Sequence, residues 1–160
     1  MIKRSCFALG ILFFSFSSQA TVTIDTVNEK KVWEEVNNYR HKHGWEELKL
    51  NAVMTREAEQ HSREMAEHKI PFGHKKFNDR IHRILTTIEK PNGGAENVAY
   101  FKKNGAEVVR LWLTSSGHRH NIQGHYNLTG VGVVRDEKGW LYYTQIFARN
   151  DAKGNISRGN

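Results

Sequence analysis

The sequence contains a single cysteine, Cys6, which lies in an N-terminal stretch that we expect to be removed. A folded chain that begins after Cys6 has no disulfide bond, thiol nucleophile or cysteine zinc ligand. Its stability therefore does not come from disulfide bonds, and a hydrophobic core has to replace them. With 160 residues, 38% of them hydrophobic, the chain is long enough to build such a core in one domain.

Residues 1–20 have the pattern of a secretory signal peptide. Lys3 and Arg4 give a positive start, an apolar stretch follows, and the closing Ser-Gln-Ala is similar to an A-x-A cleavage site. We therefore expect a secreted or periplasmic protein that begins at Thr21 and has no transmembrane span after cleavage. Because Cys6 is not at the cleavage point, we do not expect a lipid anchor.

The charge of the chain limits its partners. Removal of the two positive charges of the signal peptide would lower the formal charge from +7 to +5. A basic exported protein suits anionic envelope surfaces or lipid head groups. Its basic residues are scattered rather than clustered, so we do not expect nucleic acid as a partner. A lipid, a cell-envelope polymer and a protein remain open as partners.

Local patterns predict most of the secondary structure. Apolar periodicity predicts three helices, over residues 29–42, 52–68 and 106–114. Two apolar segments near the C-terminus, 130–135 and 140–149, are predicted as strands, and the turn residues between them favour an antiparallel hairpin.

The remaining segments are less regular in sequence. Residues 71–84 are expected to form a short helix or a wound loop, residues 90–94 a loop, and residues 95–101 an extended or helical piece. The polar lead-in, 21–28, and the polar C-terminal tail, 150–160, are expected to be irregular.

A dense group of polar residues follows the third predicted helix. Ser115 and Gly117 interrupt that helix, and we expect Ser116 to cap a second short helix that carries His118 and Asn121. These polar groups can titrate or form hydrogen bonds, and they directly follow an apolar helix. We therefore expect this segment to form one wall of a functional site.

Several short motifs occur together in a fixed order. They are NNYRHKHG at 37–44, FGH at 72–74, GAENVA at 94–99, WLTSSGHRHNI at 112–122, GVG at 130–132 and YYTQIFA at 142–148. Together they resemble the CAP superfamily (SCP-like: cysteine-rich secretory proteins, antigen 5 and pathogenesis-related 1), and most of all its cysteine-free bacterial branch. The resemblance implies an α+β fold, an α-β-α sandwich with a small antiparallel sheet between helical layers, over residues 29–149.

The resemblance also implies a cleft that holds two histidines and two glutamates in eukaryotic members, where they can bind a divalent metal. His74 and Glu96 match two of these positions, whereas Ser115 and Tyr142 replace the other two. His118 is the candidate to complete the cleft. We expect His74, Glu96 and His118 to converge as the candidate catalytic or zinc-binding residues. The other residues expected to line the cleft are Ser115, Ser116, Arg119, Asn121, Tyr142 and Thr144.

A His-Glu-His set can form a hydrogen-bonded network, an open zinc site or a catalytic centre. Two functions therefore stay open: a secreted binding module for a lipid, an envelope component or a protein, and a metal-assisted hydrolase of peptide or cell-wall material. The altered family positions favour the binding module. Among the other polar residues, His61 is interpreted as an ordinary helix residue. Arg80 is interpreted as a fastener of loops, through main-chain carbonyls or through Asp79.

Overall fold

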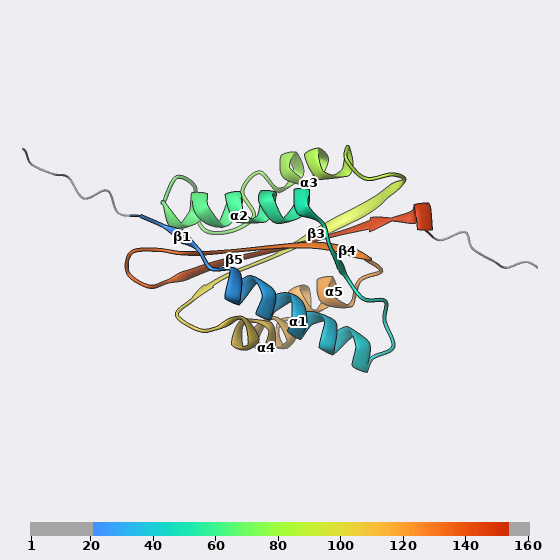
Figure 1. Ribbon diagram of the computed structural model, residues 1–160, viewed down its shortest axis with the longest axis horizontal. Coiled ribbons are helices and arrows are strands. Elements are labelled where there is room, and N and C mark those ends of the chain that lie inside the picture. Colours follow the sequence, from blue (N-terminus) through green and yellow to red (C-terminus); the bar gives the residue numbers. More distant parts are fainter. Residues whose placement is uncertain (1–20, 154–160) are drawn as a thin grey trace, which may run out of the picture.

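The computed structural model describes residues 21–153 as a sheet between two helical layers (Figure 1). One face of the sheet is covered by α2 (Ala52–Ala66) and α3 (Phe77–Leu85). The opposite face is covered by α1 (Thr26–Lys42), α4 (Gly105–Thr114) and α5 (Ser116–Gln123). This arrangement confirms the predicted α-β-α sandwich. The predicted signal peptide, 1–20, and the end of the tail, 154–160, lie outside the described residues.

The sheet is mostly antiparallel. Its strand order is β1 (Thr23–Ile24), β4 (Leu128–Arg135), β5 (Leu141–Asn150) and β3 (Pro91–Phe101), and the short β2 (Lys49–Leu50) pairs with β4 in parallel. Strands β4 and β5 form the predicted hairpin. Asp136 fixes its turn, because one carboxylate oxygen accepts the N–H groups of Lys138 and Trp140 at 2.9 and 2.8 Å. Strand β3 is left at the edge of the sheet.

Two glycines of β4 let α2 lie directly on the sheet. A Cβ at Gly130 would overlap the backbone of Met54 and Thr55, and a Cβ at Gly132 would overlap that of Ala58 and Glu59. The GVG motif is therefore a packing requirement, since any side chain there would push helix and sheet apart.

Buried Arg40 joins the ends of α1 and α5. Its guanidinium donates to four main-chain carbonyls, those of Glu46, Ile122, Gly124 and Tyr126, at 2.7–3.0 Å. These carbonyls lie at the ends of α1 and α5 and in the segments that follow them, so one side chain provides hydrogen-bond donors for both helix ends. Arg40 ties the segment that carries His118 to the body of the domain.

The start of the domain differs from the prediction. The lead-in 21–28 is ordered, because Thr23 and Ile24 pair with β4 and α1 begins at Thr26. Asp25 caps that helix, and its side chain accepts the Asn28 N–H at 3.0 Å. The strand that orders this segment lies more than 100 residues further along the chain. The polar sequence of residues 21–28 gives no sign of that pairing.

Three further boundaries differ. Residues 91–94 are the start of β3 rather than a loop, because pairing of this segment with β5 overrides its turn-forming sequence. Ser116 is the first residue of α5 and not its cap. Ser115, which has an extended backbone, occupies the cap position without a side-chain capping bond. In the tail, Asn150 ends β5 and residues 151–153 form a 3₁₀ turn, so these residues are ordered.

Among residues 21–153, no helix has both the length and the apolar character needed to cross a bilayer.

Candidate functional site

Glu96, on β3, is the centre of a buried polar cluster. Its side chain is only 2% exposed, and both carboxylate oxygens have partners. The Nε and Nη2 atoms of Arg80 donate to Oε2 at 2.8 and 2.6 Å. His74 Nδ1 lies 3.0 Å from Oε1, and it must be the donor because an ionised carboxylate only accepts. The negative charge of Glu96 is therefore balanced inside the protein.

Arg80 belongs to this cluster, although the sequence analysis did not pair it with Glu96. It is buried on α3, and it pairs with Glu96 and not with its neighbour Asp79. Its Nη1 atom also reaches the Lys75 carbonyl at 3.3 Å, so the predicted contact with a carbonyl is present. Arg80 and Ile84 are four residues apart and both buried, and this spacing is the sequence signal that marks the arginine as inward-facing.

His61 extends the cluster to helix α2, where it faces the sheet. It is buried on α2, with Nδ1 3.2 Å from the Thr144 hydroxyl oxygen and 3.8 Å from Glu96 Oε2. Burial lowers the pKa of His61 to about 4, an effect to which Arg80 adds and which Glu96 opposes. The ring is therefore neutral at pH 7. The interpretation of His61 as an ordinary helix residue misses this role, although its helical spacing with Ala58 places it on the buried face.

His118 lies on α5, apart from the carboxylate. In the described part of the chain its ring makes no hydrogen bond to Glu96. It lies 6.2 Å from the ring of Trp112, measured between ring centroids. Burial lowers the pKa of His118, and the nearby His74 lowers it further. The structure thus brings His74 and Glu96 into direct contact, whereas the His118 side chain makes no hydrogen bond to either of them among residues 21–153.

The residues expected to line the cleft have different positions. Ser115 lines the same cavity as His118, and Tyr142 lines a neighbouring cavity. Ser116 is exposed. Thr144 is fully buried under the cluster, where its hydroxyl oxygen accepts a hydrogen bond from Ser62 at 2.8 Å.

Asn121 and Arg119 act as braces. Asn121 Nδ2 donates to the Glu96 carbonyl at 3.2 Å and to Asn97 Oδ1 at 2.9 Å, which fastens α5 to β3. Arg119 donates to the Leu113 carbonyl at 2.9 Å, across the break between α4 and α5. Both side chains position the wall that carries His118.

An apolar groove opens beside His118. This cavity of about 590 Å³ is lined by Ser115, His118 and eight apolar or aromatic residues, among them Leu111 and Trp112. A second cavity of about 520 Å³ shares Phe72 and Tyr100 with it.

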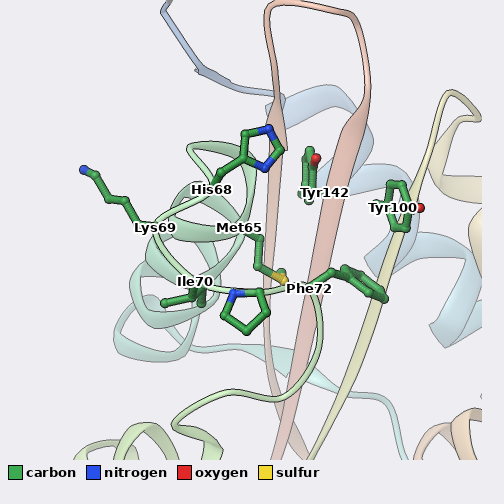
Figure 2. Close-up of a pocket in the computed structure, with 8 residues that line it drawn as sticks. Met65, His68, Lys69, Ile70, Phe72, Tyr100 and Tyr142 are labelled. Atoms are coloured by element: carbon green, nitrogen blue, oxygen red, sulfur yellow. The ribbon is translucent and has the colours of Figure 1, made fainter.

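Figure 2 shows this second cavity between the loop that follows α2 and the sheet. The rings of Tyr100 and Tyr142 stand side by side on the strands. Phe72 and His68 come from the loop, and Lys69 points away from the cavity.

The donors of the cluster do not fit the divalent metal that the resemblance implies. Both oxygens of Glu96 are occupied, and the guanidinium of Arg80 beside them would repel a cation. Within residues 21–153, no set of three or more His, Cys, Asp or Glu side chains is placed to hold a metal ion. A metal at Glu96 would first require its separation from Arg80.

Comparisons with known proteins agree with this architecture. The family model described as the cysteine-rich secretory protein family, CAP, matches residues 33–147. A protein of Bacillus subtilis (strain 168), described as uncharacterized protein YkwD, is 30% identical over 123 residues, which are 76% of this chain and 47% of that protein. The chain therefore spans about half the length of this relative.

Solved structures share the fold. An extracellular protein with an SCP domain from Bacillus anthracis is 26% identical, with a TM-score of 0.68 over 79% of this chain and 41% of that one. An outer surface protein of Borrelia burgdorferi has a TM-score of 0.71 at 17% identity, over 82% and 99% of the two chains. Together with the family match, the sandwich identifies this chain as a domain of the bacterial type that belongs to the CAP, or cysteine-rich secretory protein, family.

Proposed function

We propose that this chain is an exported binding module that holds a cell-envelope ligand in the groove beside His118. The observation that carries the proposal is an open apolar groove set next to a carboxylate cluster whose charges are already balanced. The groove offers surface for a ligand, and the cluster gives its wall a fixed shape.

The exposure of the groove supports binding. Leu111 is 40% exposed, although it lies beside the buried Trp112. Large apolar side chains that remain exposed around one cavity mark surfaces that become covered by a partner. The few polar groups on this wall, from His118 and Ser115, provide directional contacts of the kind that orient a ligand in an apolar site.

The chemistry of Glu96 favours binding over hydrolysis. A general base needs a free lone pair that points to the proton it removes. Glu96 is buried and has a donor on each oxygen, so it would have to leave Arg80 before it could act as a base. A carboxylate held in this way is suited to fixing helix α3 and the loop at His74 against the sheet.

Export is part of the proposal. It is supported by the signal-peptide pattern of residues 1–20 and by the similarity to an SCP-domain protein described as extracellular. Basic charge remains after removal of that segment, which suits an anionic envelope.

Sedimentation with envelope fractions tests the proposal. Purified protein is mixed with isolated membranes and with insoluble cell-wall polymer, and the bound fraction is measured for the wild type and for Leu111→Glu. We expect binding to at least one fraction, weakened at least tenfold by Leu111→Glu. The matched control is Val27→Glu, because Val27 is 77% exposed on α1 and is not part of the groove lining. Equal binding by all three proteins would refute the groove as the site.

The same samples test the hydrolase. Release of soluble peptide or wall fragments is measured with zinc and with a chelator. Zinc-dependent release that is lost in His74→Ala would establish the metal-assisted hydrolase in place of the binding module.

A further inference from the structure

We infer that the ligand of this groove is a glycan chain, whose sugar rings stack along an aromatic strip formed by the exposed rings of Phe72, Tyr100 and Trp140, with the buried Tyr142 supporting Tyr100 from the neighbouring strand. The inference rests on the proposed function, since it names the class of ligand that the groove accepts.

The strip is continuous and centred on Tyr100. The Tyr100 ring lies 4.9 Å from that of Phe72, 5.4 Å from that of Trp140 and 5.7 Å from that of Tyr142, measured between ring centroids. Phe72, Tyr100 and Trp140 are 48%, 43% and 37% exposed. Because Phe72 and Tyr100 line both cavities, the strip joins them into one track across the end of β3.

The strip is held by rigid parts of the fold. Tyr100 and Tyr142 are opposite each other in the register of β3 and β5, so their side chains share one face of the sheet. The loop that carries Phe72 is anchored two residues earlier by Ile70, which packs on the buried cluster that contains Tyr142. Rings that are positioned before binding lose little freedom when a ligand covers them.

The shape of the track favours a chain of rings over an acyl chain. An acyl chain gains most from a closed apolar tunnel, whereas here the two cavities are connected by exposed ring faces. A sugar ring has an apolar C–H face that packs on an aromatic ring and hydroxyl groups at its rim that stay hydrated or hydrogen-bonded. The hydroxyl groups of Tyr100 and Ser115 have no hydrogen-bond partner among residues 21–153, so they are available to such a rim.

The charge of the track favours an uncharged or acidic glycan. No Asp or Glu lines either cavity. Lys102 lies over the Trp140 ring, 5.4 Å from its centroid, and His68 and His118 stand at the two cavities. Lys69 is neutralised locally by Glu67 at 2.7 Å. A polymer of cationic sugars would find no countercharge here.

A peptide is a poorer fit. Peptides commonly bind at a sheet edge by adding a strand, which needs free main-chain groups on that edge. On β3 the Val98 carbonyl accepts from Trp112 at 3.4 Å and the Glu96 carbonyl accepts from Asn121 at 3.2 Å. Two of the carbonyls that an added strand would use on this edge are therefore already occupied.

Titration with defined probes tests the inference. The probes are chitobiose and chitohexaose, both fully N-acetylated and therefore uncharged, vesicles of phosphatidylglycerol and phosphatidylethanolamine, and a ten-residue polyproline peptide. Binding is followed by calorimetry and by tryptophan fluorescence. We expect chitohexaose to bind at least tenfold more tightly than chitobiose, because only the longer chain reaches both cavities, and we expect no binding of vesicles or peptide.

Variants of the strip locate the site. Tyr100→Ala is expected to weaken chitohexaose binding at least tenfold, and Tyr100→Phe to retain most of it, because stacking needs the ring. The aromatic control is Trp45→Ala, since Trp45 lines a different cavity. Thermal unfolding of each variant shows whether it is folded. If Tyr100→Ala does not fold, Trp140→Ala is used, because Trp140 lies outside the buried core.

Each other result overturns the inference. Vesicles or peptide bound in a Tyr100-dependent way, without chitohexaose, would assign the strip to a lipid or a protein. Envelope binding that depends on Leu111 but not on Tyr100 would leave the proposed function standing and remove the glycan. Absence of all envelope binding would refute the proposed function itself.

Discussion

Two nitrogens of Arg80 converge on one oxygen of Glu96, Oε2, and leave the other oxygen to His74. Nearly the whole interaction between arginine and glutamate thus passes through a single atom that is shielded from water. Charge-assisted bonds of this kind are strong, but removal of one partner exposes the other to an apolar interior. The pair is therefore expected to behave very differently from a surface ion pair.

The first prediction is that Glu96→Ala unfolds much more easily than the wild type. Arg80 would keep its buried charge without a partner, at a cost of about 3–5 kcal/mol in the free energy of unfolding. Urea denaturation measures this change. Arg83 provides the control on the same helix: it makes two similar bonds to Glu57, at 2.9 and 2.6 Å, but is exposed. Arg83→Met should cost about 0–1 kcal/mol. If both variants lost the same free energy of unfolding, burial would not be the reason for the large cost of Glu96→Ala.

The second prediction concerns acid. The pKa of His61 is about 4 in the folded protein and near its ordinary value of 6.5 in the unfolded chain. Between these values the unfolded chain binds the proton, so stability falls as the pH drops from about 6.5 to about 4. This one residue accounts for a loss of about 3 kcal/mol at most.

Replacement of His61 tests that loss. His61→Gln keeps a polar group near Thr144 but does not titrate, so its stability should change less between pH 7 and pH 4 than that of the wild type. The measurement is urea denaturation across this range. His82→Gln is the control, because His82 is exposed on α3. If the stability of His61→Gln fell with pH as steeply as that of the wild type, His61 would not titrate as described.

The third prediction has the opposite sign. Burial raises the pKa of Glu29 to about 7, helped by Glu59 and Asp25 and opposed by a hydrogen bond from the Val133 N–H. The unfolded carboxyl group loses its proton near 4.5, so stability falls as the pH rises from about 4.5 to about 7.

Glu29→Gln separates this effect from that of His61. The amide oxygen can still accept from Val133, but the side chain stays neutral. The variant should be more stable than the wild type by about 1–2 kcal/mol at pH 8 and no more stable at pH 4. Thermal unfolding at the two pH values measures the difference, and a gain of equal size at both would contradict the titration.

The fourth prediction concerns the contact of α2 with β4. A methyl group at Gly132 would overlap the backbone of α2, so Gly132→Ala should lower the free energy of unfolding by about 1–3 kcal/mol. Gly117→Ala is the control, because no atom lies within 4 Å of a Cβ placed there. It should be neutral or stabilising by up to about 1 kcal/mol, since alanine favours a helix. Urea denaturation measures the free energy of unfolding of both variants. Equal values for the two would show that close packing at Gly132 is not the cause of the loss.

The sequence predicts those parts of the fold whose pattern is local. Helices α1, α2 and α4 each carry an apolar stripe, and the β4–β5 hairpin has turn residues between two apolar strands. Asn51 caps α2, accepting two main-chain N–H groups at 3.0 and 3.1 Å, which is typical of asparagine at this position. Strand β1 and the start of β3 could not be predicted, because polar and turn-forming residues become extended there only through pairing with distant strands.

The site shows the same limit. The resemblance to the family led to His74 and Glu96, which do meet. Of the two partners expected for Arg80, a main-chain carbonyl is present, but the acid is Glu96 and not its sequence neighbour Asp79, because consecutive residues of a helix point in different directions. His61 was visible only as a polar residue on an apolar face, and its partners come from other elements.

Arg40 gives the wall of the groove an anchor that depends little on pH or salt. Its charge is met by four carbonyl dipoles. Carbonyl groups do not titrate, and buried contacts with them are little screened by salt. A change of pH or of salt concentration would therefore leave this anchor unchanged.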